Sequence, residues 1–195
     1  GIVTMDKKRI KSIYDEIIRL TTIVKDIEQL HQIEWQTYKL DYQSFDIKDL
    51  LNECIHSLEV KQLEKNISVL FDSESIIIEA DRYRLFQVFY NIIVNAYNYS
   101  EKNAKLFISL NRMQHSLAII IKDSGIGIPQ ESLQYLFERF YRVDSSRSRV
   151  SGGSGIGLTI VKQLVEAHGG SIEVESEINF GTTFTISLPL KRSDV

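Results

Sequence analysis

Residues 151–162 read SGGSGIGLTIVK, and this stretch decides how the rest of the chain is interpreted. Glycines alternate at Gly153, Gly155 and Gly157, and an apolar, helix-prone run follows at once. Glycines before a helix start offer free backbone N–H groups and a positive dipole end, with no Cβ to obstruct a phosphate. The same composition is also typical of a flexible linker, so the loop by itself leaves both alternatives open.

The two best-known nucleotide fingerprints do not fit this loop. A Walker-type loop needs GxxxxGK[ST], and no lysine follows a glycine in this chain. A dinucleotide fingerprint needs G-x-G-x-x-G directly after a strand, whereas here the spacing is G-x-G-x-G after a polar segment. A phosphate site at this loop would therefore be of another design.

The composition limits the class of protein. At 195 residues, with 43% hydrophobic and 25% charged residues, the chain is an ordinary soluble protein with one sizeable core. Its net charge of −3 argues against a general nucleic-acid binder. The single cysteine, Cys54, excludes an intramolecular disulfide and fits a reducing cytosol. The histidines and Cys54 show no paired spacing typical of zinc ligands.

The sequence also predicts a cytoplasmic location without membrane contact. It has no apolar run of about 18 residues and no signal-peptide pattern. The chain starts at Gly1 and becomes helical almost immediately, which favours a piece excised from a longer protein. A membrane anchor of the intact protein would then lie upstream.

The first forty residues predict one long helix of coiled-coil type. Apolar residues three and four apart form a seam at Ile10, Ile13, Ile17, Leu20, Val24 and Ile27. One helix cannot bury such a seam alone, so we expect a partner helix. His31 falls on the next seam position and is interpreted as a seam or surface histidine. The pattern breaks at 41–46.

Beyond residue 46 the pattern mixes helices with hairpin strands. Strands are expected at 67–71, 75–79, 105–110, 117–122, 171–176 and 182–188. Asp46 and Asp81 are plausible helix N-caps, Pro129 fits the start of a helix through 130–140, and a helix from Ile156 is stopped by the Gly169–Gly170 pair. This order predicts a two-layer α/β (α+β) sandwich, with a mixed, mostly antiparallel sheet and helices on one face.

Two groups of polar residues suggest chemistry. Asn91 and Asn95 are four apart on one helix face, where their amides could hold a hard cation such as Mg²⁺ or simply face solvent. Asp123 ends an apolar strand and precedes Gly125 and Gly127. Its carboxylate could accept hydrogen bonds from an exocyclic amine while a base lies against the glycines. A plain turn explains the same residues.

A basic segment precedes the glycine loop. It reads RFYRVDSSRSR and carries Arg139, Arg142, Arg147 and Arg149. Arginine is the natural bidentate partner of phosphate oxygens, although a solvated charge run has the same composition.

The order of these pieces resembles the ATP-binding catalytic domain of bacterial sensor histidine kinases, within the gyrase, chaperone, histidine-kinase and mismatch-repair ATPase fold. RLFQVFYNIIVNAYNYS resembles the N box of that family, DSGIGIP its first glycine box, LFERFYRVD its F box, and GGSGIGLTIVKQLVEAHGGSIEVES its second glycine box. The similarity covers roughly residues 44–190. Residues 1–42 resemble the second helix of the dimerisation and histidine-phosphotransfer hairpin, and 43–195 the catalytic domain.

The resemblance implies a role for each matching residue. Asn95 would be the principal Mg²⁺ ligand, assisted by Asn91, and Arg142 would reach the γ-phosphate from the ATP lid. Asp123 would bind the adenine amine. The rest of the ATP site would be formed by Tyr99, Gly125, Gly127, Gly153, Gly155, Gly157 and Leu158. Phosphoryl transfer relies on positioning and charge neutralisation, which these groups would supply.

The resemblance also implies a homodimer through the helical hairpin and a response-regulator receiver domain as partner. Asn98 stands where the family often has a lysine or arginine, which suggests weaker ATP binding. His31 lies on the second hairpin helix and is rejected as the phosphoacceptor, so this chain alone is not expected to autophosphorylate. A gyrase-like ATPase and a regulatory nucleotide-binding module remain alternatives. Gyrase-type relatives carry a water-activating glutamate where this chain has Asn91, and an amide cannot act as a general base.

Overall fold

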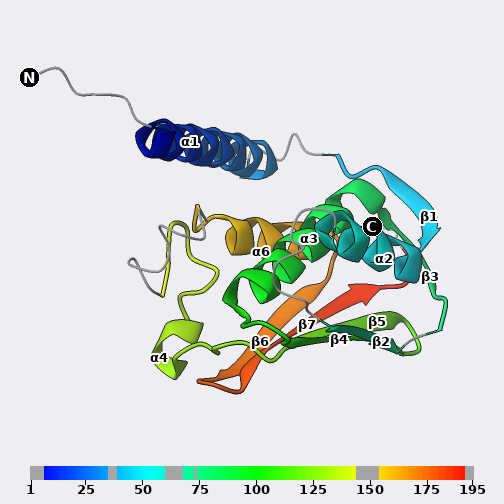
Figure 1. The fold of residues 1–195 in the computed structure, drawn as a ribbon. Coiled ribbons are helices and arrows are strands. Elements are labelled where there is room, and N and C mark those ends of the chain that lie inside the picture. The colour runs from blue at the N-terminus through cyan, green and yellow to red at the C-terminus, as the bar shows by residue number, and fades with distance from the viewer. Residues whose placement is uncertain (1–6, 35–38, 60–67, 73, 144–153, 192–195) are drawn as a thin grey trace, which may run out of the picture.

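The structure is a computed structural model that describes residues 7–34, 39–59, 68–72, 74–143 and 154–191. A five-stranded sheet forms one layer and three helices form the other, with a long N-terminal helix lying apart from the sheet (Figure 1). The predicted two-layer α/β sandwich preceded by a long helix is therefore confirmed.

The large sheet has the strand order β2-β4-β5-β7-β6. Its strands are β2 (Ser68–Asp72), β4 (Lys105–Arg112), β5 (Ser116–Asp123), β6 (Ser171–Glu177) and β7 (Gly181–Pro189). Only the β2–β4 pair is parallel, and the other three pairs are antiparallel. This pairing places the carboxyl end of β5 beside the start of β7.

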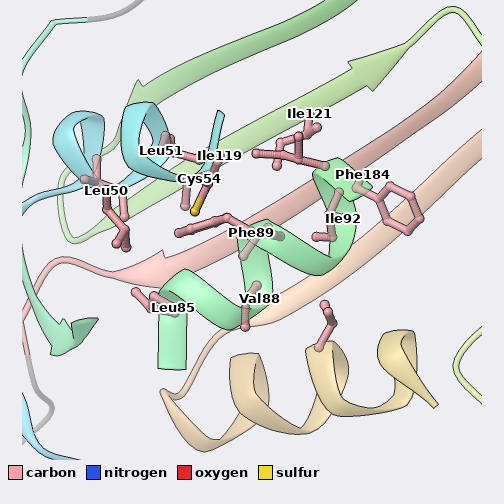
Figure 2. Packing of buried hydrophobic residues seen from close by; sticks show 14 of the residues in the cluster. Leu50, Leu51, Cys54, Leu85, Val88, Phe89, Ile92, Ile119, Ile121 and Phe184 are labelled. Atoms are coloured by element: carbon pink, nitrogen blue, oxygen red, sulfur yellow. The ribbon is translucent and has the colours of Figure 1, made fainter. Parts of the chain in front are cut away.

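Helices α2 (Ile47–Glu59), α3 (Arg82–Tyr99) and α6 (Gly157–Ala167) cover one face of this sheet (Figure 1). Alternate residues of β5 point into the core, and Leu117, Ile119 and Ile121 are almost completely buried. Figure 2 shows Phe89 of α3 beside Cys54 of α2, in the same cluster of buried residues as Ile119 and Ile121 of β5. Burial raises the pKa of the Cys54 thiol to about 12, so the thiol stays protonated in this core.

Both predicted helix boundaries at α3 and α6 are confirmed. The Asp81 carboxylate accepts a hydrogen bond from the Arg84 amide at 3.0 Å and caps α3. Gly169 has a φ of +72°, and its amide donates to the Glu166 carbonyl at 2.9 Å. This left-handed residue ends α6, as glycine does after many helices.

The segment 41–46, expected only as a break, contains a strand. Strand β1 (Tyr42–Asp46) pairs antiparallel with β3 (Ile77–Asp81) in a second, two-stranded sheet. Asp46 also caps α2, as predicted, because its carboxylate accepts from the Lys48 amide at 2.9 Å. The strand escaped prediction because five residues are too few to show a period and its partner lies far along the chain.

The expected helix from Pro129 through residue 140 is wrong in length. Helix α4 (Gln130–Leu133) is short, and the backbone then forms turns with bonds between residues three apart, such as Glu138 N–H to the Tyr135 carbonyl at 2.9 Å. Phe140 then has a φ of +62°, which no α-helix accommodates. The apolar spacing of this segment is shared by a helix and by successive tight turns.

Helix α1 (Lys7–Glu34) confirms the long N-terminal helix. Its expected seam residues are all about half exposed, from 45% at Ile27 to 55% at Ile17, so the described part of the chain does not bury the seam. The side chain of His31 is not described. The boundary of the two domains near residues 42–43 stays a prediction.

Within the described residues, no helix is long and apolar enough to cross a membrane.

Candidate functional site

The site lies where the carboxyl end of β5 meets the last turn of α3 and the start of β7. Asp123, the final residue of β5, is 7% exposed. Its Oδ1 accepts hydrogen bonds from the amides of Gly125 at 2.8 Å and Thr182 at 3.2 Å. Within the described residues, Oδ2 accepts none. The carboxylate is therefore fixed on one side and has acceptor capacity left on the other.

Burial has a clear effect on this carboxyl. Loss of solvation raises the pKa of Asp123, and the two amide hydrogen bonds oppose that rise in part. A desolvated carboxylate gains strongly from one more donor, such as an exocyclic amine, because hydrogen bonds to a charged group are the stronger ones.

The loop after Asp123 approaches α3 so closely that Gly125 has no room for a side chain. A Cβ there would lie 2.7 Å from the Tyr99 carbonyl oxygen and 2.8 Å from Asp123 Oδ1. The next amide, of Ile126, donates to the same Tyr99 carbonyl at 3.2 Å. The Tyr99 side chain is 45% exposed, at the rim of this junction.

The other side of the loop packs on the β6–β7 turn. Gly127 has a φ of +70°, and a Cβ there would overlap the Glu177 carbonyl oxygen at 2.0 Å. The Asn179 amide donates to the Ile126 carbonyl at 2.8 Å. The loop is thus held between α3 and the final hairpin, which requires glycine at both predicted positions.

The end of the glycine loop lies close to helix α3, which carries Asn91 and Asn95. Asn91 and Asn95 are half-buried on α3, opposite its buried face of Phe89, Ile92 and Ile93. A Cβ placed on Gly157, the first residue of α6, would lie 3.8 Å from Asn91 Cγ. The structure therefore brings Gly157 against the Asn91 amide.

The start of α6 is suited to an anion. No side chain caps this helix, so its first amides keep donors to offer. Thr159, in the first turn, is buried, and its Oγ1 has no hydrogen-bond partner within the described residues. Leu158 beside it is half-buried. The uncapped amides fit a bound phosphate group.

The segment before the loop is joined to it at one point. Gly155 has a φ of +74°, and its carbonyl accepts from the Phe140 amide at 2.9 Å. Arg142, two residues beyond Phe140, is half-buried. Gly153, Arg147 and Arg149 lie outside the described residues. Arg142 therefore follows, by two residues, the point where this segment is hydrogen-bonded to the glycine loop.

Two residues of the site were not predicted from the sequence. Thr182 donates its amide to Asp123 across a separation of 59 residues. Gly181 has a φ of +103°, and a Cβ there would overlap the Asp123 carbonyl oxygen at 2.0 Å. The pair opens β7 as GT, which by itself indicates only a turn.

The described residues contain no cluster of three histidine, cysteine, aspartate or glutamate side chains that could hold a metal. Amide oxygens could also contribute to a cation site, since Mg²⁺ beside phosphates takes few ligands from the protein and completes its shell with water and phosphate oxygens. Asn91, close to Gly157, and Asn95, one turn further along α3, carry such amide oxygens.

Comparisons with known proteins identify the family of this chain. Residues 80–192, more than half of the chain, match the family model described as histidine kinase-, DNA gyrase B-, and HSP90-like ATPase. The sensor protein kinase WalK of Staphylococcus haemolyticus is 36% identical over 182 residues, which are 92% of this chain and 30% of that protein. The chain thus spans about a third of the length of this relative.

Solved structures give the same result. The histidine kinase AdeS of Acinetobacter baumannii matches with a TM-score of 0.80 and 27% identity, over 97% of this chain and 88% of that one. Histidine kinase ThkA, solved in complex with the response regulator protein TrrA, matches with a TM-score of 0.75 and 30% identity, over 94% and 51% of the two chains. The chain belongs to the histidine kinase-, DNA gyrase B- and HSP90-like ATPase family, and the relatives and solved structures to which it is similar are histidine kinases.

Proposed function

We propose that this chain binds Mg²⁺·ATP and donates the γ-phosphoryl group to a histidine outside the chain. In that step the bond from the γ-phosphorus to the bridging oxygen breaks, a phosphorus–nitrogen bond forms, and ADP leaves. The observation that carries the proposal is the close approach of Gly157, at the end of the glycine loop, to Asn91 on helix α3. It joins a candidate phosphate cradle to a candidate cation site.

We assign the individual residues the roles that the resemblance to the family implies. Asp123 would bind the adenine amine through Oδ2, with Gly125 and Gly127 shaping the base pocket and Tyr99 at its rim. Asn95 would bind Mg²⁺ with help from Asn91. Gly155, Gly157 and Leu158, together with Gly153, would surround the phosphates. Arg142 would neutralise charge on the γ-phosphate, where an arginine is most effective.

Transfer is favoured over hydrolysis. Hydrolysis needs a group that activates water, and the Asn91 amide beside Gly157 cannot take a proton. Gyrase-like ATP hydrolysis is the second candidate, and a nucleotide-binding regulatory module without chemistry is the third.

The proposed partners rest on the first helix and on one relative. The exposed seam of α1, which includes Ile13, Ile17 and Val24, supports pairing through a helical hairpin in a homodimer of the intact protein. Since ThkA was solved with a response regulator, we propose a receiver domain of that class as the acceptor of the phosphoryl group.

Calorimetry with ATP, with and without Mg²⁺, tests the binding half of the proposal. Wild type should bind ATP more tightly when Mg²⁺ is present. Asn95→Ala should reduce that Mg²⁺ effect about tenfold or more. Substitutions of residues that only support a metal ligand already lower metal affinity about 10- to 100-fold. Asn111→Ala, an exposed asparagine on β4, is the matched control. Equal Mg²⁺ effects in Asn95→Ala and wild type would contradict the cation assignment.

Labelling with γ-³²P-ATP separates the candidate functions. The chain alone should acquire no acid-labile label, and the longer protein with its phosphoacceptor helix should acquire it. Acid-labile labelling of the chain alone would overturn the rejection of His31. Steady phosphate release without any labelled protein would favour the gyrase-like reading.

A further inference from the structure

We infer that Ser176 is a positioning residue for Asp123 and thereby favours a base that carries an exocyclic amine. The inference rests on the proposed function and adds to it a residue that sets base specificity. Ser176 lies on β6, one residue before the strand ends, and its side chain is half-buried.

The Ser176 hydroxyl joins the two segments that flank the candidate base pocket. Its Oγ accepts a hydrogen bond from the Ile128 amide at 2.9 Å, in the loop after β5. It donates to the Gly181 carbonyl at 2.8 Å and lies 2.9 Å from Thr182 Oγ1, both at the start of β7. One hydroxyl therefore links the loop after β5 (residues 124–129, called the base loop below) to β7.

The same two segments supply both donors of the Asp123 carboxylate. Gly125 donates from the base loop at 2.8 Å, and Thr182 donates from β7 at 3.2 Å. Ser176 thus holds together the two segments that donate to Asp123, and it does not itself bond to the carboxylate. If its hydroxyl were removed, the Ile128 amide would lose its acceptor and the loop would be free to move away from β7.

The hydroxyl also fixes the direction of a neighbouring hydrogen bond. The Gly181 carbonyl can only accept, so it takes the single proton of Ser176. The Ile128 amide occupies one lone pair of Oγ, and the other is left for the Thr182 hydroxyl to donate to. Thr182 Oγ1 then presents only lone pairs to any other group.

These polarities select among bases. An ionised Asp123 accepts hydrogen bonds only, and Thr182, whose amide bonds to Asp123, keeps no hydroxyl proton for a base because it donates that proton to Ser176. An exocyclic amine, as in adenine, can donate to Asp123 Oδ2. An exocyclic carbonyl at the same position, as in hypoxanthine, meets oxygen with oxygen and is repelled.

A purely structural role for Ser176 would have a different effect. The β6–β7 ladder pairs Ser176 with Thr182 and Glu177 with Gly181 through the backbone, so the register does not need the hydroxyl. Loss of the hydroxyl should therefore change the relative affinity for the two kinds of base, while the melting temperature changes little.

The test compares Mg²⁺·ATP with Mg²⁺·ITP, which carries a carbonyl in place of the amine, by calorimetry on the same chain. For Ser176→Ala we expect ATP affinity to fall about 3- to 10-fold, the effect of losing one intramolecular hydrogen bond, and ITP affinity to fall less. Ser176→Thr keeps the hydroxyl and should restore the ATP/ITP ratio. Ser171→Ala, an exposed serine on the same strand, is the matched control. Melting curves of all variants verify folding.

Asp123→Asn, alone and combined with Ser176→Ala, separates this inference from the proposed function. Because Ser176 acts through Asp123, adding Ser176→Ala to Asp123→Asn should lower the ATP/ITP ratio little further. Equal losses of ATP and ITP in Ser176→Ala, or full additivity in the double variant, would overturn the positioning role while the adenine assignment stands. If the wild-type chain bound ATP and ITP with nearly equal affinity, both the positioning role of Ser176 and the adenine assignment would be overturned.

Discussion

Replacing Asp123 by asparagine tests the base assignment most directly. Asp123 Oδ1 already accepts from the amides of Gly125 and Thr182. An asparagine can keep both of these bonds through its single amide oxygen. Its NH₂ group must then take the place of Oδ2 and face the adenine amine, donor against donor.

The size of the loss follows from this geometry. The substitution replaces a charge-assisted hydrogen bond by a mismatch in a site that is 7% exposed. Such a mismatch costs about 1–3 kcal/mol, which corresponds to about a 5- to 150-fold loss of ATP affinity. Hypoxanthine should lose less or gain, because its carbonyl can accept from the new NH₂ group.

Folding should survive the same change. Burial raises the pKa of Asp123, so the folded chain holds a proton on this group more readily than the unfolded chain does. Above the raised pKa, the ionised carboxylate therefore opposes folding, and an uncharged asparagine relieves that cost. We expect the melting temperature at pH 7 to stay equal or rise.

Calorimetry with ATP and ITP, together with thermal melting, measures all three effects. Asp49→Asn is the matched control, since it makes the same chemical change at an exposed position of α2. Unchanged ATP affinity in a folded Asp123→Asn variant would refute the adenine assignment. So would equal losses for ATP and ITP.

Three further predictions concern the phosphate end and the helix junction. Gly157→Ala should keep or slightly raise stability, by up to about 1 kcal/mol from helix propensity, because its Cβ would meet Asn91 at an ordinary 3.8 Å; ATP affinity by calorimetry should fall, since the methyl group occupies the phosphate approach, and unchanged affinity would contradict the cradle. Arg142→Ala, measured in the longer protein, should lower the rate of phosphoryl transfer more than ATP affinity, and equal losses would assign this arginine to ground-state binding instead. Burial lowers the pKa of His168 below its ordinary 6.5, and its Nε2 accepts from the Asp81 amide at 3.2 Å. The unfolded chain therefore binds this proton more readily, so the free energy of unfolding from urea melts should fall as the pH drops below 6.5, and His168→Gln should flatten that slope.

The positions of the main helices and strands could be predicted because their determinants are local. The Asp81 cap and the Gly169 stop lie within a few residues of the backbone groups that they bond to. Likewise, the alternation of Leu117, Ile119 and Ile121 marks β5 without knowledge of its neighbours. Helix α4 failed this test, because the turns that replace it have nearly the same apolar spacing as a helix and differ in the backbone of Phe140.

The candidate site was predicted in its parts but not in its assembly. The sequence by itself determined the ATPase family, through the order of Asn91, Asp123 and the glycine loop. Only the tertiary structure decided that Thr182 donates to Asp123, that Ser176 joins both flanking segments, and that Gly157 lies against Asn91. These contacts depend on the β5–β7 pairing and on α6 packing against α3, which bring together residues far apart in the chain. A local pattern specifies which residues form a strand or a helix, whereas the distances between elements are set by packing the whole core.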